Sequence, residues 1–378
     1  MAVCADALFD DIVGQRRARA ILERALETGP SHAYLFTGPP GVGKTEAALA
    51  FAAALCCNEG GCGVCPVCRR VREGIHPDVD LVSPEGTFIT VDQIRGINHD
   101  TSLRPFESRS RVTIITEAEA MNTPAANAFL KTLEEPPPHA YFVLVTSAVE
   151  RLLPTIVSRC QRVAFQQAAA QELEAYLRRC CQVTDLEAKS FARASEGSPA
   201  YARRLAESAS AREHRDQLIN WARRVPEASF YDLDVAADEI LASLEHLGEE
   251  RAAELEAARE RQREWAGDAR TRNRIEKLFD QRIKRERRRA QADGLAEVLR
   301  VFAGWYRDLA TVAVGADEAA LNEDYLYELR NSAFAGMVPG YLGAVDAVKR
   351  AQERFRYNVD AKCTLEDMLL AIKEALLP

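Results

Sequence analysis

One glycine-rich stretch near the N-terminus, YLFTGPPGVGKTEAA, constrains the fold of this chain more than any other feature. It follows β-prone residues and precedes an alanine-rich run, so it predicts a strand, a tight loop and a helix in that order. In such a loop glycines let backbone N–H groups surround phosphate oxygens, and the helix N-terminus directs its positive dipole end toward them. The stretch therefore predicts a nucleotide phosphate site.

The predicted phosphate-binding residues are Gly38, Pro39, Pro40, Gly41, Val42, Gly43, Lys44 and Thr45. Lys44 can reach the β- and γ-phosphates, and the Thr45 hydroxyl can ligate the Mg²⁺ that accompanies ATP or ADP. Hydrolysis needs more, namely a carboxylate near the metal and a group that positions water. The nearby β-prone run RVTIIT ends in Thr116, followed by Glu117. Glu117 can orient water, but Thr116 brings no negative charge, so we expect binding with weak or no hydrolysis.

Four cysteines lie within twelve positions: Cys57, Cys62, Cys65 and Cys68. Thiolates this close can converge tetrahedrally on Zn²⁺, and intervening glycines allow the tight turns. Cys56 could replace Cys57 as the first ligand. An iron–sulfur cluster is the competing interpretation, but the ferredoxin-type spacing with its final cysteine and proline is not continued after Cys68. A closed site of four thiolates has no open coordination position, so we expect a structural Zn²⁺.

Length and charge narrow the class of protein. A chain of 378 residues is expected to form two or three domains. It has no apolar run of about 18 residues and no visible secretory signal in MAVCADALFD, so we expect a cytoplasmic protein. The net charge of −8 argues against a stand-alone nucleic-acid binder, although it allows DNA contact within an assembly. The basic run RIKRERRR at 282–289 is interpreted as a solvated helix face paired with acidic neighbours.

Residues 1–165 contain β-prone runs, AYLFTG, VDLVSP, RVTIIT and YFVLVTS, separated by helix-like sequence. This alternation predicts a parallel sheet covered by helices on both faces. From about 166 onward helical patterns continue to Pro378. Residues 245–292 are dense in Glu and Arg and predict two charged helices in a hairpin, with a break at Gly267 and Asp268. A long coiled coil is the weaker interpretation because no heptad stripe is sustained.

These features together resemble the AAA+ clamp-loader subunits of bacterial DNA polymerase III. The opening LFDDIVGQ, the loop SHAYLFTGPPGVGKT and the cysteine insertion are followed in the family's order by HPDVDLVSPEGTFITVDQIR, NAFLKTLEEPPPHAYFVLVTS and LLPTIVSRCQ. Near the C-terminus, FRYNVDAKCTLEDMLL is similar to the family's last collar helix.

The resemblance implies an α/β P-loop AAA+ core followed by an all-α lid and an all-α collar. The implied bounds are 1–165 for the core with its zinc-binding insertion at 56–70, 166–212 for the lid, and 213–378 for the collar with the charged insertion at about 245–292. The implied partners are gamma/tau and delta-type subunits in a ring, the sliding clamp, and primed DNA through the assembly.

Within this family the chain resembles the delta-prime subunit more than the gamma/tau motor. The motor has Asp-Glu where this chain has Thr116 and Glu117, and a phosphate-sensing arginine where it has Ala200. An ATP-hydrolysing gamma/tau-type motor is the alternative, and polymerase chemistry belongs to another subunit in either case. The resemblance also implies that Arg159 of SRC acts as an arginine finger in a neighbouring subunit's site, and that Thr146 is a polar sensor.

Overall fold

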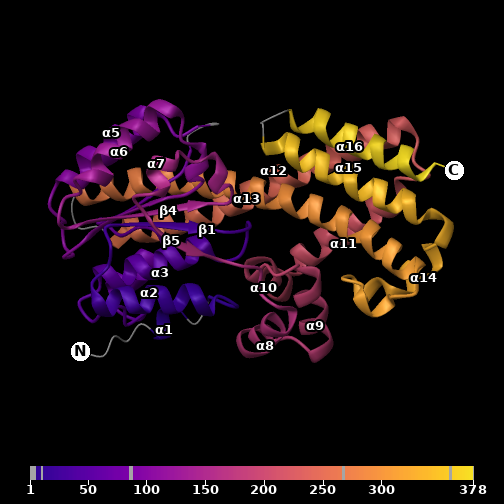
Figure 1. The fold of residues 1–378 in the computed structure, drawn as a ribbon, viewed down its shortest axis with the longest axis horizontal. Helices are drawn as coiled ribbons and strands as arrows, with labels where there is room; N and C mark the ends of the chain where they lie inside the picture. The colour runs from indigo at the N-terminus through magenta and orange to yellow at the C-terminus, as the bar shows by residue number, and fades with distance from the viewer. Residues whose placement is uncertain (1–5, 10–11, 85–87, 266–268, 357–359, 378) are drawn as a thin grey trace. The chain divides into compact units, whose positions relative to one another are not determined.

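The computed structural model describes residues 6–9, 12–84, 88–265, 269–356 and 360–377. The chain divides into two compact units, Met1–Cys181 with Ser195–Arg203 and Gln182–Ala194 with Arg204–Pro378. The first unit holds a parallel β-sheet with its helices, and the described part of the second is helical (Figure 1). The predicted fold class is therefore confirmed. The segment predicted as a separate lid, 166–212, is divided between the two units. That it forms a domain of its own stays a prediction.

The sheet has five parallel strands in the order β2-β3-β4-β1-β5. Their bounds are β1 (Ala33–Thr37), β2 (Val79–Val82), β3 (Arg111–Ile115), β4 (Ala140–Thr146) and β5 (Gln161–Ala164). The register pairs Thr37 with Thr146 at the ends of β1 and β4, and Ile115 at the end of β3 with Leu144. The carboxyl ends of these three strands therefore meet at one edge, where open α/β sheets carry their ligand sites.

Helices cover both faces of this sheet, because strand residues alternate between two cores. Tyr34 and Phe36 of β1 belong to the core shared with the first set of helices, and Ala33 and Leu35 to the core shared with the second. The first set is α1 (Asp6–Phe9), α2 (Arg16–Thr28), α3 (Lys44–Cys56) and α4 (Pro66–Arg72). The second is α5 (Val91–Ser102), α6 (Thr123–Glu134) and α7 (Pro154–Val157).

Shorter elements complete the first unit. They are η1 (Ala118–Ala120), η2 (Val149–Arg151) and α8 (Ala170–Cys180), with the start of α10 (Pro199–Glu207). Strand β5 was not predicted from the sequence. It is four residues long at the edge of the sheet, and of its side chains only that of Val163 is buried, so it lacks the apolar run that marks the other strands.

The second unit is a helical bundle around one apolar core. Its elements are α9 (Asp185–Ala194), α11 (Ala209–Arg224), α12 (Phe230–Trp265), α13 (Ala269–Ala313), η3 (Asp317–Ala319), η4 (Glu323–Tyr325), α14 (Leu326–Ser332), η5 (Ala335–Met337), α15 (Val338–Arg356) and α16 (Ala361–Leu376). Trp305 and Tyr306 of α13 are buried at its centre, and the Tyr306 hydroxyl donates to the carbonyl of Ala222 at 2.6 Å. No described helix has the length and apolar character needed to cross a membrane.

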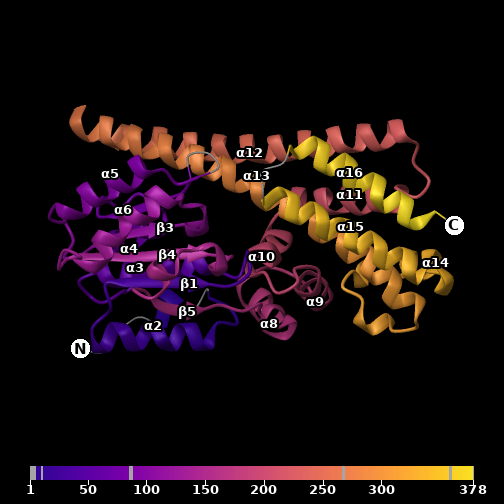
Figure 2. The ribbon, with the colours of Figure 1, turned by 45° about the horizontal axis from the view of Figure 1, so that its top comes forward.

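Helices α12 and α13 run antiparallel (Figure 2). Arg259 of α12 pairs with Asp280 of α13 at 2.9 Å, and Glu249 pairs with Arg287 at 3.8 Å. As the residue number falls along α12, it rises along α13, which fixes the antiparallel direction. Ion pairs between the two helices thus connect the strongly charged parts of their sequences.

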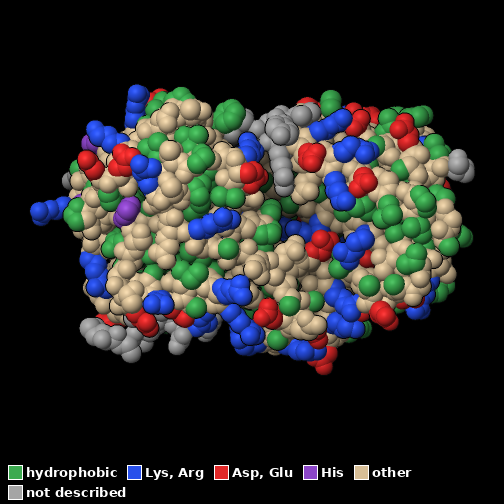
Figure 3. All heavy atoms as spheres, in the orientation of Figure 1, with side chains coloured by type: hydrophobic (Ala, Val, Ile, Leu, Met, Phe, Trp, Pro, Cys, Tyr) green, Lys and Arg blue, Asp and Glu red, His purple; other side chains and the backbone are tan. Residues whose placement is uncertain are grey.

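The charged segment 245–292 occupies the end of α12 and the start of α13. The predicted break at Gly267 and Asp268 lies outside the described residues. Within the basic run 282–289, Arg287 faces an acidic residue of α12, in line with the interpretation of this run as a paired helix face. On the face shown in Figure 3, basic and acidic side chains are interspersed over the helical unit.

Asp78, just before β2, organises the segment that leads into β3. Its buried carboxylate accepts the backbone N–H groups of Phe106, Glu107 and Ser108 at 2.5, 2.9 and 2.9 Å. The neighbouring buried His76 accepts the N–H of Asp78 at Nδ1 and lies 3.0 Å from Glu107 through Nε2. One carboxylate thus accepts three successive backbone N–H groups of this segment, and ionised acceptors make strong bonds to such groups.

We predict that Asp78→Ala destabilises the first unit by roughly 2–4 kcal/mol, because three backbone donors lose a charged acceptor. Urea denaturation followed by circular dichroism measures this change. Asp78→Asn is the matched control, since it keeps the size and one acceptor oxygen and should lose less. A loss below about 0.5 kcal/mol in the alanine variant, the range of ordinary surface substitutions, would contradict this role.

Candidate nucleotide site and metal centre

The predicted phosphate loop connects β1 to α3, as the sequence pattern indicated. Gly38 directly follows β1 with φ of 148°, and a Cβ there would lie 2.3 Å from the carbonyl oxygen of Phe165. Gly43 ends the loop in the left-handed conformation, with φ of 91°, and nothing lies within 4 Å of the position a Cβ would take. Because glycine has no side chain to cap α3, the N-cap residue does not compete with an anionic ligand for the N-terminus of the helix.

Lys44 is buried and bonded inside the loop. Its Nζ donates to the carbonyl oxygens of Gly38 and Pro39 at 2.6 and 2.5 Å and to the hydroxyl of Ser147 at 3.0 Å. An ammonium has three N–H donors, so these three acceptors hold the side chain along the loop. Ser147 follows directly after β4, so this one residue ties the loop after β1 to the end of the neighbouring strand.

Sequence reasoning missed Glu119, which lies on the short helix η1 after β3. Its Oε1 accepts the N–H of Ser147 at 3.1 Å, whereas Oε2 is buried and has no hydrogen-bond partner among the described residues. Burial lowers the pKa of Lys44 to about 8, and the negative charge of Glu119 opposes that shift. The sequence position of Glu119 could have indicated it, because it lies just beyond the end of a central strand. That strand end was expected to lie at the same edge of the sheet as the phosphate loop.

Thr116 and Glu117 directly follow the end of β3. The Thr116 hydroxyl donates to the carbonyl of Val82 on β2 at 3.1 Å, so it is engaged by the neighbouring strand. Glu117 is exposed and has a φ of 51°, a left-handed conformation that is uncommon for a residue with a side chain. The carboxylate expected at position 116 of an active ATPase is therefore replaced by a neutral hydroxyl that is already bonded.

Two residues assigned roles by resemblance have local partners. Thr146, at the end of β4, is buried, and its Oγ1 accepts the N–H of Ala148 at 3.1 Å. The hydroxyl that bonds Lys44 belongs instead to the next residue. Arg159 follows α7 and donates from Nη1 to the carbonyl of Thr155 at 3.0 Å and from Nη2 to Glu134 at 2.5 Å. Its side chain is 36% exposed, so the guanidinium is accessible from outside the chain.

The segment that leads into α10 lies beside the phosphate loop within the first unit. The Ser198 hydroxyl donates to the carbonyl of Gly41 at 3.0 Å, and a Cβ on Gly41 would approach that hydroxyl oxygen to 2.6 Å. Two residues further on, Ala200 is exposed in the first turn of α10. A methyl group therefore stands at the position where the resemblance predicts an arginine in a motor subunit.

Gln15 links the opening segment LFDDIVGQ to the same loop and was not singled out from the sequence. It is buried, its Oε1 accepts the N–H of Gln166 at 2.9 Å, and its Nε2 donates to the carbonyl of Val42 at 3.4 Å. The side-chain amide can do this because it carries both a donor and an acceptor. The N-terminal segment thus helps to hold the loop in place.

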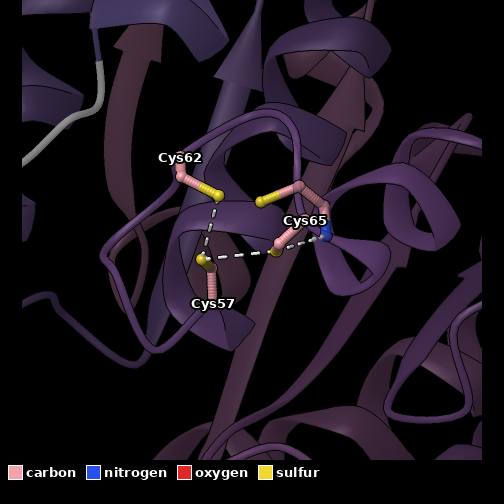
Figure 4. Close-up of side chains that lie close together, drawn as sticks. Cys57, Cys62 and Cys65 are labelled. Atoms are coloured by element: carbon pink, nitrogen blue, oxygen red, sulfur yellow. Dashed lines mark hydrogen bonds between the residues drawn. The ribbon is translucent and has the colours of Figure 1, made fainter.

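The four clustered cysteines converge between α3 and α4. Their Sγ atoms all lie within 4.8 Å of one another, and those of Cys62 and Cys65 are 3.9 and 3.7 Å from that of Cys57 (Figure 4). Four sulfurs at ~2.3 Å from a tetrahedral Zn²⁺ would be about 3.8 Å apart. The spacing and the four soft donors therefore fit Zn²⁺ with Cys57, Cys62, Cys65 and Cys68 as ligands.

The structure places only one of the two candidate first ligands in the cysteine cluster. Cys57 belongs to the cluster, whereas Cys56 is buried with its thiol 3.6 Å from the carbonyl of Ser110, and burial raises its pKa to about 12. For Cys57 burial also acts to raise the pKa, but backbone N–H groups, foremost that of Cys62, outweigh it and lower the pKa to about 7. The thiol that enters the cluster is thus the one that its surroundings help to ionise.

A glycine loop with a buried lysine, at the carboxyl edge of a parallel sheet, defines the P-loop class of α/β proteins. Residues 14–169 match the family described as "DNA polymerase III, delta subunit". The chain is 42% identical over 164 residues to the DNA polymerase III subunit delta' of Bacillus subtilis, covering 42% of this chain and 50% of that protein. Over this matched segment the chain is similar to DNA polymerase III clamp-loader subunits, and the predicted resemblance is confirmed.

Both kinds of subunit occur among the relatives. The chain is 40% identical over 173 residues to the tau subunit of Bacillus subtilis, covering 44% of this chain and 30% of that one. It is 37% identical over 203 residues to the delta' subunit of Pseudomonas aeruginosa, covering 52% and 61%. A gamma subunit-related protein of Thermotoga maritima is 18% identical, covers 95% of this chain and 99% of that one, and has a TM-score of 0.42. The chain spans about half the length of the curated delta' relative from Bacillus subtilis.

We predict that the purified protein contains one Zn²⁺ per chain and that Cys65→Ser loses it. The variant should lose up to about 4 kcal/mol of stability, the amount a ligand gives at a thousand times its dissociation constant. Elemental analysis and thermal denaturation measure the two effects. Cys363→Ser, which changes an exposed cysteine of the other unit, is the control and should keep the metal. Iron or no metal in the wild-type protein would rule out the zinc assignment.

Proposed function

We propose that this chain is a delta-prime-like subunit of a cytoplasmic DNA polymerase III clamp-loader complex. It helps to load the sliding clamp onto primed DNA, and it binds ATP or ADP with weak or no hydrolysis of its own. The observation that carries the proposal is an intact phosphate loop with the neutral Thr116, bonded to Val82, directly after β3. Both lie in the segment that matches the family described as "DNA polymerase III, delta subunit".

The proposed architecture follows the family's three parts. Residues 1–165 form the AAA+ core with a zinc-binding insertion at 56–70, residues 166–212 the helical lid, and residues 213–378 the helical collar with a charged insertion at about 245–292. The collar would join gamma/tau and delta-type subunits in a ring, and the clamp and primed DNA would be engaged through that assembly.

Each part of the loop has a role in nucleotide binding. Gly43 leaves the N-terminus of α3 open to phosphate oxygens, and Lys44 brings an ammonium that exchanges carbonyl partners for phosphate oxygens. Thr45, the next residue on α3, would hold Mg²⁺ through its hydroxyl. When bound, Mg²⁺ supplies positive charge that offsets the negative charge of the phosphates.

Two positions support weak hydrolysis. The Thr116 hydroxyl carries no charge, and Ala200 offers a methyl group where an arginine would sense the γ-phosphate. An ATP-hydrolysing gamma/tau-type motor is the second candidate, favoured by the 40% identity to a tau subunit. These two positions weigh against it, because transition-state charge in phosphoryl transfer is stabilised by charged groups.

The proposed arginine finger acts outside its own chain. Arg159 is held at the surface by a pair with Glu134, and exposed ion pairs of this kind contribute only about 0–1 kcal/mol. A neighbouring subunit's phosphates could therefore draw the guanidinium away from Glu134 at little cost. Its planar fork matches phosphate oxygens in a way that an ammonium does not.

We predict that the isolated chain binds ATP and that Lys44→Ala weakens binding about 10- to 100-fold, the range for a lost hydrogen bond to a charged group. Titration calorimetry measures the affinity, and phosphate release measures turnover, which should stay slow. Lys349→Ala, which removes an exposed lysine of α15, is the control and should bind normally. Turnover comparable to that of a motor subunit would favour the second candidate.

We predict that Arg159→Ala changes the chain's own nucleotide affinity little and its stability by less than about 1 kcal/mol. A reconstituted complex should nevertheless lose DNA- and clamp-stimulated ATP turnover, because arginine fingers contribute about 10³- to 10⁵-fold in nucleotide hydrolases, diluted here by the other sites. Rates at saturating ATP measure this loss. Arg159→Lys should fail to restore the rate.

The exposed Arg151 of η2 offers the matched control, since Arg151→Ala removes an arginine from the same region. Unchanged stimulated rates with Arg159→Ala would show that Arg159 is an ordinary surface residue here.

A further inference from the structure

The nucleotide site has a place for a metal-associated carboxylate that the two residues after β3 do not fill. Thr116 is neutral and bonded to Val82, and Glu117 is exposed on a left-handed turn. Magnesium prefers oxygen ligands and is usually bound in proteins through one or two carboxylates together with phosphates. Another acidic residue at this edge could therefore serve the metal in their place.

Glu119 has an oxygen with no partner in this region. One carboxylate oxygen, Oε1, is anchored by the N–H of Ser147 at 3.1 Å, which fixes the orientation of the group. The other oxygen, Oε2, is buried and has no hydrogen-bond partner among the described residues. Buried polar atoms are almost always satisfied, so this carboxylate oxygen is available to a ligand such as a metal ion or a water molecule.

A continuous set of hydrogen bonds connects this carboxylate to the phosphate loop. Glu119 accepts from the backbone of Ser147, and the hydroxyl of Ser147 accepts from Nζ of Lys44 at 3.0 Å. Lys44 in turn donates to the carbonyl oxygens of Gly38 and Pro39 in the loop. The order β3-β4-β1 in the sheet explains the arrangement, because η1, Ser147 and the loop each follow one of three adjacent strands.

We propose that Glu119, through Oε2, is the carboxylate that holds the Mg²⁺ of the bound nucleotide, in the role that Thr116 does not provide. The inference rests on the proposed nucleotide binding and adds a residue that the acidic-strand pattern does not contain. Ser147 is the positioning residue, because its N–H orients the carboxylate and its hydroxyl orients Lys44. The carboxylate that accepts a hydrogen bond from the end of β4 is that of Glu119, two residues beyond the left-handed turn at Glu117.

A different role for Glu119 makes a different prediction. As a counter-charge to Lys44 alone, it would matter equally with and without Mg²⁺, and any residue of the same charge would serve. Glu46 on the first turn of α3 also acts on the charge of Lys44, but its side chain is exposed. The dependence of nucleotide affinity on Mg²⁺ therefore separates a metal-binding carboxylate from a simple counter-ion.

The test titrates the full chain with a fluorescent ATP analogue, once in excess Mg²⁺ and once in EDTA. For the wild type we expect tighter binding in Mg²⁺. Glu119→Gln should reduce that gain by about tenfold or more, the usual cost of losing a group that supports a metal, while binding in EDTA stays the same or tightens. Glu150→Gln, which neutralises an exposed carboxylate of η2, is the matched control and should keep the full gain.

A second variant keeps the inference testable if Glu119→Gln fails to fold. Glu119→Asp keeps the charge but withdraws the carboxylate by one methylene. A metal-binding role predicts a smaller Mg²⁺ gain for this variant, and a counter-ion role predicts an unchanged gain. Mn²⁺ binding in the presence of the analogue, followed by electron paramagnetic resonance, should weaken in parallel. Either Glu119 variant retaining the full Mg²⁺ gain would overturn the inference. A wild type that binds no analogue in either buffer would instead overturn the proposed nucleotide binding.

Discussion

The arrangement of the candidate nucleotide site depends on the hydrogen bonds of the Lys44 ammonium. It bonds two carbonyl groups of its own loop and the hydroxyl of Ser147, so it joins the segments that follow β1 and β4. These segments meet only because the two strands are parallel neighbours and end level, as the pairing of Thr37 with Thr146 shows. A buried ammonium needs such partners, since burial lowers its pKa to about 8 and so disfavours the charged form that phosphate requires.

Helix α3 links the phosphate loop to the cysteine cluster. It begins at Lys44 and ends at Cys56, with Cys57 as its C-cap, so its thirteen residues span about 20 Å at ~1.5 Å per residue. The carbonyl of Cys57 accepts from Arg109 at 2.7 Å, close to the turn that Asp78 organises. A metal held at one end of this buried, alanine-rich helix would lie on the same helix as the phosphate loop at its other end.

The chemistry at the carboxyl edge is divided among residues on three strand ends. Lys44 and Thr45 follow β1, Glu119 follows β3, and Ser147 follows β4. The threonine at position 116 brings no charge to this set, and its hydroxyl bonds to Val82 on the neighbouring strand. A site of this kind can keep its affinity for nucleotide and lose most of its hydrolysis, since binding and transition-state stabilisation depend on different groups.

The sequence by itself determined the features that are local. The glycine loop, the strand before it and the helix after it follow from residue spacing over about fifteen positions, and the cysteine spacing pointed to a metal site. Three other strands could be predicted because each is a short apolar run, whereas β5 could not, because only one of its side chains is buried.

Tertiary structure alone decided which of Cys56 and Cys57 joins the cluster, since adjacent side chains leave a helix end in different directions. It alone showed that Ser147 rather than Thr146 bonds Lys44, and that Glu119 is the anchored carboxylate. These contacts join residues up to about a hundred positions apart, and only the pairing of strands in the sheet brings such residues together.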